Sequence, residues 1–528
     1  MSLAQTETWL DPLWVAQFSR EASVRLPARG RGGSRSHALR WQAKLEDEQL
    51  ARTASPTLTV PDRPLPLAQP GLLEDVVAGP SVDAVTVLTV YLGLLLLIPS
   101  ELIIASLGFA VTPAGLVGLF ALVWWVSSRL VPVLGGARGF QPVRTAVYVF
   151  AASVLASYAV AFSRAVSGVE ARAADRGLFQ AATLAGLALL AADGIVDLRR
   201  LNVLLRRLVI LASIVAGLGI FQFATGLDVA RFMRLPGLVP NGSFDFIGGR
   251  SDFRRVAGTA THAIEFGAML ATVLPLAAHY AFTADRRRAL RWLCLLSMVV
   301  AVPMSISRTA IVGLAGAALV LWPSWPARRR LQSLLALPVV AVAIKAAVPG
   351  LLGTILSLFT NLWSDPSTQG RTADYALVGR YVARHPMLGQ GFRTFLPKRY
   401  ELLDNQYLLT LMETGIVGLA ALLVLLLVPI FLMRRTRKRS RDHAVRDLAQ
   451  SLVASMVVLV LAFATFDALS FPMAAGLLFL LLGCCGALWR LARGDEQKSS
   501  ESLGTRVDAE VESALPTVST GSRGPLPG

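Results

Sequence analysis

The sequence predicts an all-α, polytopic membrane protein with about twelve transmembrane helices and a large extracytoplasmic loop. Of its 528 residues, 54% are hydrophobic and only 16% are charged, whereas soluble proteins have about a quarter charged residues. The mean hydropathy is +0.56. Long apolar runs recur along the chain, and a helix lets such a run satisfy its own backbone hydrogen bonds inside a bilayer.

The chain divides into three predicted parts. Residues 1–82 are polar and rich in arginine, without an early apolar core, so we predict a mostly disordered cytoplasmic extension and no signal peptide. Residues 83–492 form the predicted membrane domain. Residues 493–528 are rich in Ser, Glu, Gly and Pro, which predicts a disordered cytoplasmic tail.

Most apolar runs are close to the ~20 residues that a membrane-spanning helix needs. The predicted spans are residues 84–99, 111–131, 143–162, 177–195, 207–225, 263–283, 291–305, 309–323, 331–358, 405–432, 448–467 and 471–490. Between the first two spans, residues 100–110 are predicted to form a partial or re-entrant helix.

The distribution of charge predicts the orientation. An even number of spans places both termini on one side of the membrane, and short basic clusters identify that side as cytoplasmic. These clusters are residues 199–200, 206–207, 286–288, 328–330 and 434–441. The two long loops, 226–262 and 359–404, are then extracytoplasmic.

Composition and motifs exclude several function classes. The positive-inside distribution explains the net charge of +17, and no known motif indicates a nucleic acid partner. The three cysteines, Cys294, Cys484 and Cys485, lie in apolar runs, which indicates buried side chains rather than disulfides or metal ligands. No motif indicates a metal site or a cofactor.

Arginines also occur in the two predicted outer loops, where anion binding accounts for them better than the positive-inside rule. In the first loop, the Arg254-Arg255 pair can hold a diphosphate through forked hydrogen bonds, and Gly258 permits close approach of the backbone. The alternative is that these arginines contact lipid headgroups while Thr259 and His262 cap a helix.

Two further polar positions lie between apolar runs. Arg308 follows Ser307 at a predicted outer boundary, where a charged side chain is costly unless it is paired or functional. A simple turn anchor is the alternative interpretation. Asp467 is an ionisable residue that faces either a cavity or the turn before Pro472.

The second outer loop combines cations with glycines. Its main cations are Arg371, Arg380, Arg384 and Arg393. Arg380 and Arg384 are four residues apart, so one helix face can present both before Pro386 ends that helix. At the exit of the loop, Asp404-Asn405 is predicted to cap the next membrane helix, and a capping position does not exclude a catalytic role.

The order of these polar segments resembles that of the O-antigen ligase and Wzy-type polymerase superfamily. The resembling segments are residues 255–262, Ser307-Arg308, Arg371, residues 385–391, residues 404–408 and residues 413–418. The resemblance covers roughly residues 84–490. Its most specific part is the Asp-Asn-Gln-Tyr-Leu segment with the Glu-Thr-Gly-Ile-Val-Gly segment that follows.

The resemblance implies a GT-C-like membrane glycosyltransferase at the outer face of the bacterial cytoplasmic (inner) membrane, without a metal or cofactor. Its donor is a glycan on undecaprenyl diphosphate. A hydroxyl of a glycan or lipid-linked acceptor attacks the anomeric carbon, and the lipid diphosphate leaves into the surrounding membrane lipid. A flippase and a chain-length regulator are candidate partners in the synthesis of O-antigen, capsule or exopolysaccharide.

The resemblance also implies roles for individual residues. The implied substrate-binding residues are Arg254, Arg255, Thr259, His262, Arg308, Arg371, Arg380, Arg393, Asn405 and Tyr407. Where the ligases commonly carry histidine before the asparagine, this chain has Asp404, so the catalytic base is Asp404 or, alternatively, His385. This departure favours a polymerase over a ligase that transfers finished glycan to lipid A core or another acceptor.

Two other function classes fit the sequence less well. A transporter of lipid-linked glycans would carry charges at mid-membrane, whereas the charges of this chain cluster at the predicted outer mouth. A scaffolding membrane protein would not need arginine-rich outer loops in this order.

Overall fold

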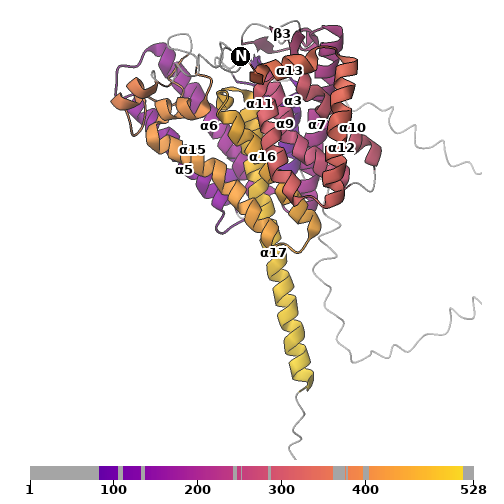
Figure 1. Cartoon of the computed structure of the whole chain (residues 1–528). Helices are drawn as coiled ribbons and strands as arrows, with labels where there is room; N and C mark the ends of the chain where they lie inside the picture. Colours follow the sequence, from indigo (N-terminus) through magenta and orange to yellow (C-terminus); the bar gives the residue numbers. More distant parts are fainter. Residues whose placement is uncertain are drawn as a thin grey trace, which may run out of the picture. The chain divides into compact units, whose positions relative to one another are not determined.

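The computed structural model describes residues 83–104, 111–131, 137–241, 247–250, 253–283, 287–360, 375, 378–396 and 403–514. The chain forms two units, Met1–Pro80 and Ser81–Gly528, and the predicted N-terminal extension lies outside the described residues. The second unit is built mainly of helices, drawn in Figure 1. The long helices are α3 (Ala84–Leu97), α4 (Pro113–Leu130), α5 (Pro142–Ala161), α6 (Gly168–Gly194), α7 (Leu198–Thr225), α9 (Ala263–Phe282), α10 (Arg288–Met304), α11 (Arg308–Leu321), α12 (Ala327–Ala347), α15 (Gln406–Arg439), α16 (His443–Phe463) and α17 (Pro472–Ala514).

Short elements connect these helices. They are α8 (Val229–Phe232), α13 (Leu351–Thr360), the 3-10 helices η4 (Trp322–Ser324) and η5 (Ala468–Ser470), and the strands β1 (Leu102–Ile104), β2 (Leu238–Pro240), β3 (Ile247–Arg250) and β4 (Phe253–Val256). Within the described residues, nine helices are long and apolar enough to cross a membrane. The prediction of a helical, polytopic membrane protein is therefore confirmed at this level.

Three sequence predictions differ from the structure. Residues 102–104 are not helical but form β1, which pairs antiparallel with β2, so that Ile103 lies opposite Val239. The predicted span 331–358 is two helices, α12 and α13, because Pro349-Gly350 interrupts it and Gly350 adopts φ 91°. Helix α17 continues to Ala514, into the tail predicted to be disordered, and no proline interrupts it between Pro472 and Ala514.

The two ends of the helical bundle differ in what they carry. At one end, called the loop end below, β1 and β2 join the segments that follow α3 and α7, and Asn241 donates a hydrogen bond to Glu101. At the other end, called the basic end, Asp83 before α3 accepts a hydrogen bond of 2.7 Å from Arg200 of α7. Chain direction alternates between these ends from helix to helix.

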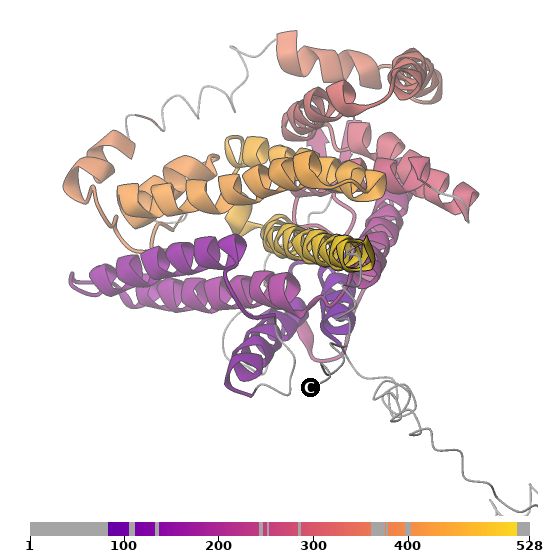
Figure 2. The ribbon, with the colours of Figure 1, turned by 90° about the horizontal axis from the view of Figure 1, so that it is seen from below.

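Helix α17 lies at the centre of the bundle. It packs against α6, α15, α16 and α5, and Figure 2 shows it in yellow between the orange pair α15–α16 and the purple pair α5–α6. In the membrane-length stretch of α17, 94% of the residues are buried, against 0% in α12. The exposed side chains of α12 include Leu334, Leu337 and Val339, which suit contact with lipid rather than water.

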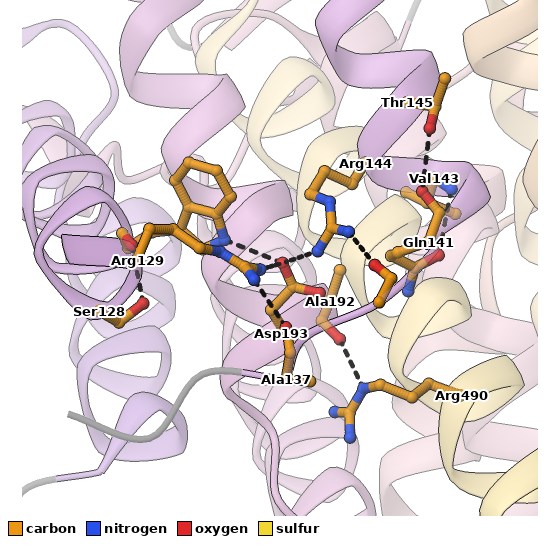
Figure 3. A network of polar contacts seen from close by, with 12 residues as sticks. Ser128, Arg129, Ala137, Gln141, Val143, Arg144, Thr145, Ala192, Asp193 and Arg490 are labelled. Carbon is orange, nitrogen blue, oxygen red and sulfur yellow. Dashed lines mark hydrogen bonds and ion pairs between the residues drawn. The ribbon is translucent and has the colours of Figure 1, made fainter. Parts of the chain in front are cut away.

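A buried carboxylate connects the helices at the basic end (Figure 3). Asp193 at the end of α6 accepts hydrogen bonds from Trp125 of α4 at 2.9 Å and from Arg144 of α5 at 3.0 Å, and it forms an ion pair with Arg129. Arg490 of α17 donates to the Ala192 carbonyl at 3.3 Å. The Asp193 carboxylate therefore connects the ends of α4, α5 and α6, and α17 is connected through the neighbouring Ala192 carbonyl.

Candidate active site

Two sequence segments of the predicted site interlock at the loop end. The backbone N–H groups of Gln390 and Gly391 donate to the carbonyls of Met412 and Glu413, at 3.0 and 2.9 Å. In the other direction, the N–H groups of residues 416 and 417 donate to the carbonyls of residues 386 and 387, at 2.9 and 3.2 Å. The outer loop is thereby fixed directly to α15.

This exchange is possible because α15 breaks at Gly415. That residue adopts φ 68° and ψ −167°, a conformation that interrupts the helical hydrogen-bond series and is open to glycine almost alone. A Cβ added at Gly415 would lie 2.2 Å from the Met387 carbonyl oxygen, and one at Gly389 (φ +67°) would lie 2.4 Å from the Glu413 carbonyl oxygen. Both glycines are required by backbone conformation and by close approach of the two segments.

A cavity of about 390 Å³ opens beside the interlocked segments. Helices α3, α4 and α6 line one side, and the 393–396 segment, α15 and the start of α17 line the other. The charged side chains in its wall are Arg176, Arg393, Glu413 and Asp467. A cavity with cations and carboxylates at one end of a membrane bundle is suited to a polar ligand that carries negative charge.

Arg393 is held in a strained conformation at this cavity. Its φ of 62° lies in the left-handed region, which costs a residue with a Cβ of order 1–3 kcal/mol. The guanidinium donates to Ser470 Oγ at 2.7 Å, to Gln180 Oε1 at 2.6 Å and to the Leu469 carbonyl at 2.8 Å. Backbone strain and three hydrogen bonds together fix the position of one positive charge between α6 and η5.

The exit of the outer loop brings two aspartates into one electrostatic environment. Asn405, rather than Asp404, caps α15, because its Oδ1 accepts from the N–H groups of Tyr407 and Leu408 at 3.0 and 3.2 Å. The Asp404 carboxylate is therefore not the cap. Burial raises the pKa of Asp467, and the negative charge of Asp404 raises it further, while Arg393 and a hydrogen bond from Ser470 oppose the shift.

A second group of predicted residues lies around the start of α9. Arg255 donates from Nε to the Ser305 carbonyl at 3.3 Å, and the N-cap His262 accepts the Ile264 N–H at 3.2 Å. Desolvation by the surrounding protein, and then the positive charge of Arg255, lower the pKa of His262. The imidazole beside Arg255 is therefore biased toward its neutral form, which can accept a proton or a hydrogen bond.

Arg308 begins α11 directly after a strained turn. Ile306 adopts φ 45°, although it is β-branched and fully buried, and such a residue in the left-handed region is an outlier. The Ser307 hydroxyl is buried without a hydrogen-bond partner among the described residues. Strain and an unsatisfied buried hydroxyl at one turn are features that cluster at functional sites.

The structure sorts the predicted cations into two groups. Arg255 and Arg308 lie near the α10–α11 turn, whereas Arg393 lines the cavity. Residues 464–472, the connection between α16 and α17, lie between the groups, because Thr309 of α11 contacts Thr465 at 2.8 Å and Arg393 contacts Ser470. A ligand that reached both groups would therefore pass this connection.

The remaining predicted residues lie outside the cavity wall or outside the described residues. Arg254 is exposed, and its guanidinium lies against Gly226. Thr259 is buried, and its hydroxyl donates a hydrogen bond of 2.5 Å to the Leu96 carbonyl. Arg380 and His385 are exposed on the outer loop. Tyr407 donates to the Val460 carbonyl at 2.8 Å and joins α15 to α16. Arg371 lies outside the described residues.

Three residues that line the cavity had no site role predicted from the sequence: Arg176, Gln180 and Glu413. Asp467, which was predicted to face either a cavity or a turn, also lines it. Arg176 and Gln180 are four residues apart, so they share one face of α6 where that helix begins at the loop end. That polar pair, ahead of an apolar run, was the available signal in the sequence. The 2% exposure of Glu413 follows only from the interlocked backbone around it.

A comparison with known families supports the sequence resemblance. Residues 293–423 match the family model described as O-Antigen ligase. The matched segment runs from α10 into α15 and includes Ser307-Arg308 and both interlocked segments. The predicted resemblance to the O-antigen ligase and polymerase superfamily is thereby confirmed. No curated protein matches the chain.

Proposed function

We propose that this protein is a metal-independent membrane glycosyltransferase that uses an undecaprenyl-diphosphate-linked glycan as donor, in surface polysaccharide synthesis. The observation that carries the proposal is the cavity at the loop end, which is lined by Arg393 and two carboxylates and bordered by segments of the O-Antigen ligase match. Fixed cations stabilise the charge of a departing diphosphate, and a carboxylate can take the proton of an acceptor hydroxyl.

In this mechanism, Arg255, Arg308 and Arg371 bind the donor diphosphate. Arg255 and Arg308 approach it from the α9 and α11 side, and the strained turn at Ile306 sets the direction of Arg308. We assign the sugar-binding region to the neighbouring cavity, with Arg393 at its wall. We propose that the remaining residues implied by the resemblance, such as Arg380 and Asn405, contact the glycan.

The arginine assignment is tested by alanine and lysine variants. Arg255→Ala, Arg308→Ala and Arg371→Ala should each reduce the transfer rate at least tenfold at normal protein level. Each variant removes a positive charge that stabilises the departing diphosphate. The lysine variants should recover little activity, since lysine lacks the two-pronged geometry of guanidinium. Transfer is measured with purified protein and a lipid-diphosphate oligosaccharide. Near-wild-type rates in all three alanine variants would refute the assignment.

Asp404 is the proposed catalytic base, and His385 is the alternative. Asp404 is favoured because Asn405 performs the capping and because Asp404 lies close enough to Asp467 to perturb its pKa. His385 is exposed on the outer loop. Asp404→Asn should abolish most transfer, and His385→Ala should retain it. The opposite pattern would assign the base to His385.

A polymerase is favoured over a ligase, because Asp404 occupies the position at which ligases commonly carry histidine. The two are separated by offering purified protein the same donor with either a second lipid-linked repeat or a lipid A core acceptor. A polymerase lengthens the lipid-linked glycan without the core acceptor. Transfer only to the core acceptor would identify a ligase. A flippase and a chain-length regulator remain the proposed partner proteins.

The proposed membrane arrangement has twelve spans, with both termini cytoplasmic in the inner membrane. The nine long apolar helices, together with α3, α10 and α11, give this number, and the loop end is then extracytoplasmic. The native cysteines are buried, so an introduced cysteine can be labelled against a low background. Ser367→Cys should react with an impermeant maleimide in intact cells. Reaction only after permeabilisation would overturn the orientation.

A further inference from the structure

A second pocket, of about 260 Å³, lies at the basic end, far along the bundle from the catalytic residues proposed above. It is bounded by the start of α5, the last turns of α15 and the part of α17 near Trp489. These three helices pack against one another. The pocket is separate from the Asp193 cluster, which involves other residues of α4, α5 and α6.

One face of α15 supplies both apolar and cationic lining. Val428, Leu432, Arg435 and Arg439 line the pocket and recur at intervals of three or four residues, which places them in a row along one helix face. The apolar members lie deeper along the bundle, and the arginines lie at its end. The lining therefore changes from hydrocarbon to positive charge in the direction of the helix axis.

Aromatic side chains flank this row. Phe140 and Phe431 line the pocket and are 76% and 63% exposed, so two large apolar surfaces are left uncovered beside it. On α17, Trp489 lines the pocket, and the Arg493 guanidinium lies over its ring, 4.9 Å from the ring centroid. The stacking holds a third cation at the pocket mouth.

The three arginines have no ion-pair partner among the described residues. Arg435, Arg439 and Arg493 are exposed, and none of the ion pairs formed within the described part of the chain includes them. By contrast, Arg329 near the same end contacts Asp447 at 3.5 Å. Three guanidinium groups that have no ion-pair partner in the described part of the chain, above an apolar groove, match one ligand chemistry, a phosphate group joined to hydrocarbon chains.

We propose that this pocket binds an anionic phospholipid, with its phosphate held by Arg435, Arg439 and Arg493. One acyl chain lies along Val428, Leu432 and the two exposed phenylalanines. A zwitterionic lipid would offset the attraction with its own positive group, and free phosphate would leave the apolar surface exposed. The site is independent of the proposed glycosyl transfer, since no residue of the loop end contributes to it.

The proposal is tested by native mass spectrometry of the full-length protein in a neutral detergent. The probes are dioleoyl phosphatidylglycerol, dioleoyl phosphatidylcholine and inorganic phosphate, each titrated alone. Phosphatidylglycerol should bind about tenfold more tightly than phosphatidylcholine, because only its net charge complements the three arginines. Equal binding of the two lipids would overturn the proposal, and so would phosphate binding as tight as that of phosphatidylglycerol.

Two triple variants distinguish a built site from general surface charge. Arg435→Gln/Arg439→Gln/Arg493→Gln should weaken phosphatidylglycerol binding about tenfold. The matched control, Arg434→Gln/Lys438→Gln/Arg441→Gln, removes the same charge from exposed neighbours that do not line the pocket, and it should change binding less than about twofold. Equal losses in both variants would overturn the proposal.

A third variant tests the hydrocarbon part of the site. Phe140→Ser/Phe431→Ser removes apolar surface from exposed positions, so the fold should be retained, and this is checked by circular dichroism and by the melting temperature without lipid. The variant should weaken phosphatidylglycerol binding several-fold. Unchanged binding would show that the anion alone is recognised and would overturn the phospholipid assignment.

Discussion

At the basic end of the bundle, Arg129 and Arg144 contact the Asp193 carboxylate, whereas at the loop end Arg393 donates its hydrogen bonds to uncharged oxygens. In the first arrangement, the charges compensate one another inside the fold. In the second, the positive charge of Arg393 stays directed at a cavity that also contains Glu413 and Asp467. The two ends therefore differ in the partner of the arginine: one set of charges is compensated by a carboxylate inside the fold, and the other charge faces a cavity.

The two ends also differ in how many residues have a backbone conformation with positive φ. Of the non-glycine residues with positive φ among the described residues, Ile306 and Arg393 lie at the loop end and Arg287 lies at the basic end. Gly389, Gly391 and Gly415 add further positive φ values beside the cavity. Two of the three non-glycine residues with positive φ in the described part of the chain therefore lie at the loop end, and such conformations persist only because the surrounding packing fixes them.

The largest loss of stability is expected when a glycine at the loop end is replaced by alanine. Gly415→Ala and Gly389→Ala should each lower the free energy of unfolding by more than about 3 kcal/mol, since each adds a disfavoured φ to a contact below 2.5 Å with backbone. The control is Gly379→Ala, which has ordinary φ and open space around the added Cβ. Melting temperatures of the purified proteins measure the difference. Equal stability of Gly415→Ala and Gly379→Ala would contradict the interlocked arrangement.

A smaller loss of stability, without a loss of transfer activity, is expected when the buried carboxylate at the basic end is removed. Asp193→Asn leaves Arg129 and Arg144 without their buried negative partner and should cost about 3 kcal/mol. The transfer rate per folded molecule should stay within about twofold of wild type, because none of these residues lines the cavity. If Asp193→Asn kept normal stability but lost transfer activity, the basic end would serve transfer rather than stability, contrary to this prediction.

The pH dependence of transfer should report the coupling of the two aspartates. If a carboxylate accepts the acceptor's proton, the rate rises with pH as that carboxylate ionises. The negative charge of Asp404 contributes to the raised pKa of Asp467, so Asp404→Asn should move any acid limb due to Asp467 to lower pH. Residual transfer by this variant is measured against pH. An unchanged limb would exclude electrostatic coupling through Asp404.

The same raised pKa carries a prediction for stability. The folded protein binds the Asp467 proton more tightly than the unfolded chain, whose carboxyl has the ordinary pKa of 3.8. The contribution of this group to stability is therefore present at low pH and is lost as pH rises from about 3.8 through the raised value. Asp467→Asn should raise the melting temperature at neutral pH. A lower melting temperature would mean that the ionised form is favoured in the fold.

The smallest effect is expected at Ser307. Its buried hydroxyl has no partner among the described residues, so Ser307→Ala should leave stability unchanged or raise it by about 1 kcal/mol. The matched control, Ser305→Ala, removes a hydrogen bond of 2.7 Å to the Val302 carbonyl and should cost about 1 kcal/mol. A loss of transfer by Ser307→Ala at unchanged stability would indicate that the hydroxyl contacts the donor.

Local sequence patterns predicted several features of the candidate site, and the structure places some of them at one end of the bundle. The strained turn at Ser307-Arg308 and the glycines of residues 385–391 and 413–418 lie at the loop end, where the sequence placed polar chemistry. The sequence alone does not decide whether Asp404 or Asn405 caps α15, because either side chain can accept hydrogen bonds from the first N–H groups of a helix. Only the backbone path shows that Asn405 takes this role.

The sequence by itself determined the helical membrane architecture, because a run of apolar residues is long enough to cross a bilayer regardless of its neighbours. Only the tertiary structure decided which polar residues meet. The coupling of Asp404 with Asp467, the contact of Arg393 with Gln180 and Ser470, and the division of the cations by residues 464–472 join segments far apart in the chain. Hydropathy and spacing describe one helix at a time, whereas the site is formed by the ends of several helices that packing brings together.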